Sequence, residues 1–257
     1  MGNKITLVGA GLAGSLLAVY LAKKGFEVNV YEKRSDMRKG EVERGRSINL
    51  ALSTRGIFAL KEIGLYEEIK KIAIPMYGRM MHPVEGELMF QRYGKDDTEY
   101  INSVSRSVLN MKLMDLAEQY ENIKIHFNNR CTGMNLESGE CHFTNDNTGE
   151  NFSVTADTVI GTDGSASALR MEMLKLPGFN FSQTYLEHGY KELNIPPAQN
   201  GGFRMEKNAL HIWPRGTFML IALPNLDGSF TCTLFHPFKG EEGLNSLNTK
   251  EKAAEFF

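Results

Sequence analysis

The chain has 257 residues, of which 42% are hydrophobic and 23% charged, and its formal net charge is −2. These values are typical of a globular protein of one large or two modest domains, and they exclude a disordered or fibrous chain. A charge so close to zero gives no strong field for nucleic acid or an acidic membrane surface, so we expect no nucleic-acid partner.

Cysteines and histidines show none of the spacings of a metal site. The three cysteines are odd in number and form no C-x-x-C pair, and the six histidines are scattered. We therefore expect no disulfide framework and no bound metal. The simplest interpretation is a protein of a reducing compartment, the cytoplasm.

The first apolar run, ITLVGAGLAGSLLAVYLA at 5–22, allows three interpretations. Its uncharged length approaches that of a membrane span, and the lysines around it resemble those of a secretory signal. It also carries the order G-x-G-x-x-G after a predicted strand at 4–8 and at the start of a predicted helix at 12–24. Glycines in the first half of the run disfavour a continuous helix, which favours a nucleotide-binding turn over a membrane segment or a signal peptide.

Each glycine of this motif has a physical task. Gly9 allows the tight turn, Gly11 lets the backbone approach a pyrophosphate, and Gly14 lets helix and strand pack closely. Glu32 ends a second predicted strand at 27–32, where an acid that binds ribose hydroxyls is expected. The alternative is a site where a helix of small residues packs, and the motif alone does not separate FAD from NAD.

A second glycine-rich stretch, GTDGSASALR at 161–170, follows the middle of the chain. Asp163 lies between two glycines at the end of a predicted strand at 157–161, where α/β sheets bind ligands. An aspartate that caps the next helix explains the residues equally well. The elements expected before it are helices at 54–64 and 107–120, a hairpin around 83–88, a strand at 123–127 and short strands within 130–155.

After about residue 178 the pattern changes to strands separated by turns. The predicted strands are HGYKELNI at 188–195, GGFRME at 201–206, ALHIW at 209–213, TFMLIAL at 217–223 and SFTCTLF at 229–235. They predict an antiparallel sheet attached to a nucleotide-binding domain. NTKEKAAEFF at 248–257 begins a helix in which the chain stops, so we expect a fragment of a longer protein.

The second stretch matches G-x-D-G-x-x-S-x-x-R in full and resembles the second fingerprint of the single-component FAD-dependent aromatic hydroxylases, those like p-hydroxybenzoate hydroxylase. The matching residues are Gly161, Asp163, Gly164, Ser167 and Arg170. The resemblance implies FAD as cofactor and NADPH as co-substrate. Further stretches are similar to the members of this family that hydroxylate L-kynurenine; they lie at 44–52, 74–82, 188–197, 209–225 and 229–235.

The implied fold is α/β. It has a Rossmann-like FAD-binding domain of the glutathione-reductase and p-hydroxybenzoate-hydroxylase type over 1–178, with a substrate-contacting insertion at about 74–104. An antiparallel-sheet substrate domain over 179–248 and the start of a truncated helix over 249–257 follow. The implied reaction is NADPH- and O2-dependent hydroxylation of L-kynurenine to 3-hydroxykynurenine through a C4a-hydroperoxyflavin. Two alternatives stay open: a hydroxylase of another aromatic acid, and a flavin-binding fragment that is inactive because the C-terminal region of the family is missing.

The resemblance assigns the substrate carboxylate to Arg79 and Tyr93, and the planar fork of an arginine suits a carboxylate. Without the resemblance, Arg79 reads as an exposed strand arginine. The implied ring pocket consists of Leu210, Ile212, Ile221, Leu223, Thr233 and Phe235. These form three pairs, each two residues apart in a strand, so each pair shares one face of the sheet. An apolar pocket wall and an ordinary sheet core fit this pattern equally.

The resemblance also implies the flavin contacts, which besides the glycines Gly9, Gly11, Gly14 and Gly164 are Ala13, Glu32, Arg34, Ala51, Arg106, Cys131 and Asp163. Arg106 begins a predicted helix, where a cation is unusual and a bound phosphate or flavin edge would explain it. Cys131 is expected to be a packing contact. No side chain is assigned as a catalytic acid or base, because the cofactor performs the redox chemistry and the protein orients the substrate and excludes water.

Overall fold

The computed structural model describes residues 3–40, 48–240 and 243–256, so part of the similar stretch at 44–52 lies outside the described residues. The chain divides into two compact units. The first unit comprises Met1–Arg44, Phe58–Glu67 and Ser107–Ser182, and the second comprises Gly45–Ile57, Glu68–Arg106 and Gln183–Phe257.

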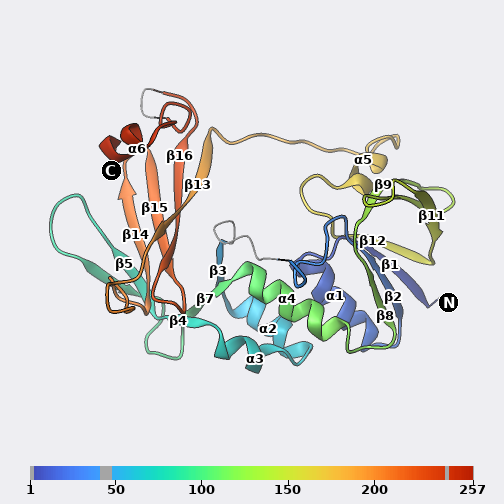
Figure 1. The fold of residues 1–257 in the computed structure, drawn as a ribbon, viewed down its shortest axis with the longest axis horizontal. Helices are drawn as coiled ribbons and strands as arrows, with labels where there is room; N and C mark the ends of the chain where they lie inside the picture. Colours follow the sequence, from blue (N-terminus) through green and yellow to red (C-terminus); the bar gives the residue numbers. More distant parts are fainter. Residues whose placement is uncertain (1–2, 41–47, 241–242, 257) are drawn as a thin grey trace. The chain divides into compact units, whose positions relative to one another are not determined.

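A four-stranded parallel sheet in the order β12-β1-β2-β8 forms the centre of the first unit (Figure 1). Its interior residues Leu7, Val28 and Val30 are at most 1% exposed. The predicted strand–helix–strand opening is confirmed, with the helix ending before Gly25 at φ +88°. The elements are β1 (Lys4–Val8), α1 (Leu12–Ala22), β2 (Glu27–Tyr31), β8 (Ile123–His126) and β12 (Thr158–Gly161).

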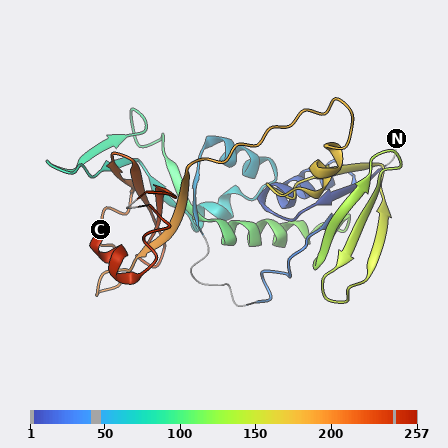
Figure 2. The ribbon, with the colours of Figure 1, turned by 90° about the horizontal axis from the view of Figure 1, so that it is seen from above.

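Three antiparallel strands, green to yellow in Figure 2, make a second sheet of the first unit. They are β9 (Asn129–Asn135), β10 (Glu140–Asn145) and β11 (Asn151–Thr155). Tyr31, Cys141 and Phe143 belong to a buried cluster that links this sheet to the parallel one. The helices are α4 (Arg106–Ala117) and α5 (Ala168–Met173); α2 (Thr54–Glu62) and α3 (Tyr66–Lys71) lie on segments divided between the units.

The second unit contains a six-stranded sheet in the order β13-β16-β15-β14-β5-β6. Only the β14–β5 pair is parallel. The hairpin predicted around 83–88 is confirmed as the turn that joins β5 to β6. The strands are β5 (Gly78–Met81), β6 (Met89–Arg92), β13 (His188–Ile195), β14 (Ala209–Arg215), β15 (Phe218–Pro224) and β16 (Phe230–Pro237). A small sheet of β3 (Asn49–Leu52), β7 (Ile101–Ser105) and β4 (Ile74–Met76) and the helix α6 (Lys250–Phe256) complete the unit.

The prediction of a strand at 201–206 is wrong. The segment turns at Gly201, which has φ +77° and donates its N–H to the Ala198 carbonyl over 2.8 Å. Phe203 and Met205 then pack against a buried sheet cluster of Ala222, Phe230 and Cys232. The alternating apolar residues of this segment therefore cover the sheet instead of joining it.

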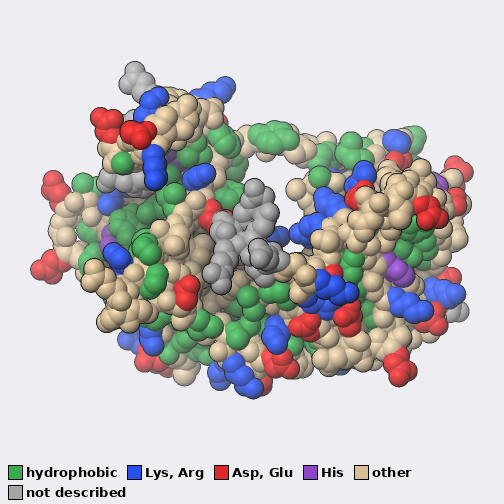
Figure 3. All heavy atoms as spheres, in the orientation of Figure 1, with side chains coloured by type: hydrophobic (Ala, Val, Ile, Leu, Met, Phe, Trp, Pro, Cys, Tyr) green, Lys and Arg blue, Asp and Glu red, His purple; other side chains and the backbone are tan. Residues whose placement is uncertain are grey.

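Side chains of both charge signs interleave on the face shown in Figure 3, in keeping with the small net charge. None of the helices in the described ranges combines the length and the apolar character needed to cross a membrane.

Candidate flavin and substrate sites

The two glycine-rich stretches, 150 residues apart in sequence, meet at the carboxyl ends of β1 and β12. The strands run in register with Val8 beside Gly161. Thr162 donates its N–H to the Val8 carbonyl over 2.8 Å and its hydroxyl to the Gly9 carbonyl over 2.8 Å. Gly9 has φ +100°, and a Cβ there would lie 2.7 Å from the Thr162 carbonyl oxygen. This role of Thr162 was not predicted, although the residue lies inside the second glycine-rich stretch.

The start of α1 leaves room for a phosphate. A Cβ on Gly14 would lie 2.7 Å from the Thr162 hydroxyl and closer still to the Gly9 carbonyl oxygen, so only glycine lets α1 pack this near. Gly11, in contrast, has nothing within 4 Å of a Cβ position. The helix has no side-chain cap and no acidic residue in its first turn, and Ala13 there is exposed. Free N–H groups beside open space form an anion site, which fits the pyrophosphate of FAD.

Glu32 is 3% exposed, and both of its carboxylate oxygens accept hydrogen bonds from the protein. Oε2 accepts from the Ala10 N–H at 2.8 Å, and Oε1 accepts from the Arg34 N–H at 3.0 Å and Nε at 2.7 Å. Burial raises the pKa of this carboxyl, but the bonds from Arg34 and Ala10 outweigh it and the pKa is lowered. Arg34 Nη2 donates a fourth, longer bond to Oε2 at 3.4 Å, so Glu32 is an ionised acceptor in which a ribose hydroxyl would replace this longest bond.

The two carboxylate oxygens of Asp163 differ in their surroundings, and its binding of a cofactor remains a prediction. Its Oδ2 accepts the Ala168 N–H at 2.8 Å, so it shapes the loop before α5, whose cap is Ser167. Its Oδ1 is buried and has no hydrogen-bond partner among the described residues. A buried acceptor without a donor is costly, so this oxygen fits a donor on a bound cofactor.

The remaining predicted flavin contacts differ in their surroundings. Cys131 packs against the cluster of Tyr31 and Phe143, and burial raises the pKa of its thiol, as expected for a packing contact. Gly164 has φ +82° in the second stretch. Ala51 in β3 and Arg106 at the start of α4 are exposed and belong to the second unit, so their contacts with a flavin remain predictions.

The predicted substrate residues share one face of the six-stranded sheet. Leu210 is registered with Arg79, Ile212 with Ile221, and Ile221 with Thr233. Alternation along each strand adds Leu223 and Phe235 to this face, and Tyr93 follows β6 in the same alternation. We call this surface the front face.

Burial separates the front face from the sheet core. Ala209, Ala222 and Cys232, which alternate with it, are at most 2% exposed and belong to the opposite face. Most of the predicted ring-pocket residues are only half-buried, although Leu223 is 4% exposed. The structure therefore places the core behind the sheet and leaves the front face as a mostly apolar wall. Thr231 and Glu192 make this face less apolar than the three predicted pairs suggested.

Arg79 and Tyr93 form a polar corner at the edge of the front face. The Arg79 guanidinium lies 5.2 Å from the centre of the Tyr93 ring. Burial raises the pKa of Tyr93 more than Arg79 lowers it, so its phenol stays a protonated donor. Gln91 lies directly across from Arg79 on the same face. Gln91 was not among the predicted site residues, although its alternation with Tyr93 places it on the same face.

A histidine pair supports β5 and β14 from behind the front face. His82 Nε2 and His211 Nδ1 are 2.8 Å apart, and His211 Nε2 lies 2.7 Å from the Glu206 carbonyl oxygen. That carbonyl requires a donor, so His211 carries its proton on Nε2 and accepts from His82. His82 also stacks on Trp213 at 4.1 Å. Burial lowers the pKa of both imidazoles.

Comparison with known proteins identifies related sequences. A family described as FAD binding domain matches residues 3–215. The chain is 54% identical over 255 residues to a kynurenine 3-monooxygenase of Myxococcus xanthus, covering 99% of this chain and 55% of that protein. It is 49% identical over 257 residues to a kynurenine 3-monooxygenase of Dictyostelium discoideum, covering 100% and 55%. The chain thus spans about half the length of the curated relatives it matches.

Solved structures share the fold. p-Nitrophenol 4-monooxygenase PnpA from Pseudomonas putida superposes with a TM-score of 0.74 at 17% identity, covering 98% of this chain and 60% of that one. 2-Methyl-3-hydroxypyridine-5-carboxylic acid oxygenase superposes with a TM-score of 0.73 at 19% identity, covering 92% and 59%. At this identity the likeness concerns the fold alone.

Proposed function

The chain belongs to the FAD-binding domain family, and from this we propose that the protein hydroxylates L-kynurenine to 3-hydroxykynurenine with FAD as cofactor and NADPH and O2 as co-substrates. The relatives named kynurenine 3-monooxygenase support the substrate, and the FAD-binding family supports the cofactor. The proposal keeps 1–178 as the FAD-binding domain, with 74–104 contributing to the substrate site, and 179–248 as the substrate domain.

The observation that carries the proposal is the polar corner of Arg79 and Tyr93 beside an apolar wall on one sheet face. L-kynurenine has an α-carboxylate at one end and an aromatic ring at the other. The guanidinium and the protonated phenol suit the carboxylate. Neighbouring strands are about 4.8 Å apart, so Leu210 and Ile221 lie roughly 5 and 10 Å from the strand of Arg79. One small molecule spans that distance.

The roles of the residues are binding, orientation and exclusion of water. Reduced flavin supplies the activation of O2 when it is bound. The half-buried apolar side chains of the front face cover the ring and keep water from the reacting atoms. Gly11 and the N–H groups at the start of α1 would hold the pyrophosphate of FAD, in a turn shaped by Gly9 and Gly14. Glu32 would accept from a ribose hydroxyl, and Asp163 Oδ1 from a cofactor donor. No side chain of the chain is proposed as a catalytic acid or base.

A reducing compartment such as the cytoplasm is proposed with this function. Cys131, Cys141 and Cys232 are all free thiols. A protein of an oxidising compartment more often pairs its cysteines.

Substitution of Arg79 tests the substrate site. In the whole holoprotein, Arg79→Ala should weaken L-kynurenine binding by about 10- to 150-fold, the effect of losing a charge-assisted hydrogen bond, with the flavin content unchanged. Arg92→Ala is the matched control, because Arg92 is registered with Gly78 and belongs to the other face of the same hairpin. Binding is measured by titration calorimetry, and turnover of L-kynurenine is compared with that of p-hydroxybenzoate. Equal affinity of the Arg79 variant and the wild type would remove Arg79 from the site.

A further inference from the structure

Ala10, between Gly9 and Gly11, has its N–H and its carbonyl held by buried side chains. The N–H donates to Glu32 Oε2 at 2.8 Å. The carbonyl accepts from Ser15 Oγ at 3.1 Å and from Asn110 Nδ2 at 3.1 Å. Ala10 is 0% exposed and Asn110 only 6%. Besides Glu32, the middle of the glycine turn is thus fixed by Ser15 and Asn110, which the predicted motif does not include.

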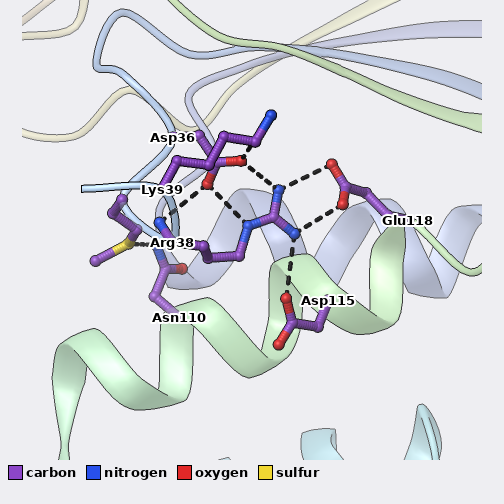
Figure 4. A network of polar contacts seen from close by, with 7 residues as sticks. Asp36, Arg38, Lys39, Asn110, Asp115 and Glu118 are labelled. Carbon is purple, nitrogen blue, oxygen red and sulfur yellow. Dashed lines mark hydrogen bonds and ion pairs between the residues drawn. The ribbon is translucent and has the colours of Figure 1, made fainter. Parts of the chain in front are cut away.

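Asn110 comes from α4, which also holds the loop after Glu32. Figure 4 shows Asp115 in α4 and Glu118 just after it bonding Arg38, with Asn110 on the same helix. Asn110 Nδ2 lies 3.5 Å from the Met37 sulfur. One helix therefore contacts both the glycine turn at 9–11, which faces the predicted phosphate site, and the loop at 36–38 that follows Glu32.

The amide of Asn110 is satisfied on one side only. The Ala10 carbonyl needs a donor, so Nδ2 faces it, and Oδ1 is left buried without a hydrogen-bond partner among the described residues. A buried unpaired acceptor lowers stability. A leucine of similar size would avoid this cost, so packing alone does not explain the asparagine.

The geometry of the peptide explains what the asparagine does. In a trans peptide the carbonyl of one residue and the N–H of the next point in opposite directions. Holding the Ala10 carbonyl toward Ser15 and Asn110 therefore aims the Gly11 N–H the other way. A flip of this peptide changes ψ of Ala10 and φ of Gly11, and the φ of Gly11 is not restricted by a Cβ.

We propose that Asn110 is a cofactor-positioning residue, which holds the Ala10–Gly11 peptide so that the Gly11 N–H faces the pyrophosphate of FAD. The inference rests on the proposed flavin site. It predicts that Asn110 sets the affinity for FAD without touching the cofactor. Ser15 shares the task, since both side chains hold the same carbonyl.

The test compares Asn110→Leu with Asn122→Leu in the whole protein freed of flavin. Asn122 donates through Nδ2 to the carbonyls of Ala22 and Phe26 at 3.0 and 2.8 Å, at the other end of α1, and is the matched control. FAD is titrated with flavin fluorescence as the readout, beside a denaturation midpoint. Asn110→Leu should raise the Kd for FAD about fivefold, whereas Asn122→Leu, which leaves two carbonyls without their donor, should lower the midpoint and change the Kd less than about twofold.

A second variant keeps the shape of the side chain and changes only the donor. In Asn110→Asp the introduced carboxyl donates to Ala10 only when protonated. Its FAD affinity relative to the wild type should therefore recover as the pH falls, a readout that a purely structural role would not move. Equal Kd values for Asn110→Leu and the wild type, or an Asn110→Asp/wild-type affinity ratio independent of pH, would overturn the inference. A wild type that fails to bind FAD would instead overturn the proposed function.

Discussion

Arg38 holds a buried carboxylate, and its removal should destabilise the first unit strongly. The Arg38 side chain is 15% exposed and that of Asp36 is 7% exposed. Nε and Nη2 donate to the two Asp36 oxygens at 2.8 Å each, and the guanidinium also bonds Glu118. Arg38→Met would leave the Asp36 carboxylate buried without this partner, which typically costs about 3–5 kcal/mol. The ion pairs of Arg38 with the half-exposed Asp115 and Glu118 add little to the free energy of unfolding.

The control is an exposed pair of the same type. Arg130 and Asp146 pair at 2.7 Å with side chains 51% and 34% exposed, so Arg130→Met should cost less than about 1 kcal/mol. Urea denaturation of the whole protein measures both variants. Adding Asp36→Asn to Arg38→Met removes the stranded charge and should recover part of the loss. If Arg38→Met costs no more than Arg130→Met, the guanidinium does not compensate a buried charge and the reasoning is refuted.

The pH dependence of this loss has a defined sign. The hydrogen bonds from Arg38 hold the pKa of Asp36 below its usual value, against the effect of burial. A carboxyl whose pKa is lowered by folding stabilises the protein above its unfolded pKa of about 3.9 and loses that contribution as the pH falls through the folded value. In Arg38→Met burial acts on Asp36 without the guanidinium, so the pKa of Asp36 should rise. The difference between the wild type and the variant should therefore be largest at neutral pH and shrink as the pH falls, first through the raised value in the variant and then through the lowered value in the wild type.

The glycine turn and the histidine pair allow two more tests. Gly11→Ala should leave the denaturation midpoint unchanged but weaken FAD binding more than about tenfold, because the added Cβ enters the space left for the phosphate. Gly14→Ala should lower the midpoint, because the added Cβ meets backbone atoms of the turn. A midpoint lowered equally by both would contradict this. His211→Gln can still donate to the Glu206 carbonyl and accept from His82, so it should keep the stability that His211→Leu loses, about 1–3 kcal/mol per stranded group in urea denaturation. Burial lowers the pKa of both imidazoles, so near their usual pKa the unfolded chain binds protons that the folded chain does not. The stability of the wild type should therefore fall as the pH drops below about 6.5. In His82→Phe this fall should be smaller.

Local sequence patterns predicted correctly the elements that depend only on residues close together in the chain. The run at 5–22 resolves into β1, the glycine turn and α1, because glycine spacing and apolar periodicity act within a few residues. The ring-pocket pairs lie on common faces for the same reason, since alternation along a strand needs no knowledge of its partner. The segment 201–206 shows the limit: its alternation is that of a strand, but a turn at Gly201 and contacts with Phe230 decide otherwise.

By itself the sequence determined the two glycine-rich fingerprints, the acid at the end of β2 and the alternation of apolar residues along the predicted substrate strands. Tertiary structure alone decided which sheet face is core and which is the wall beside Arg79, because strand register and the covering segment are set by residues far apart in the chain. It also decided that Glu32 is bonded to Arg34 and that Asn110, 100 residues from Ala10, holds the glycine turn. A polar residue inside a helix carries no sequence signal of the carbonyl it will meet, because that partner is supplied by packing and not by spacing.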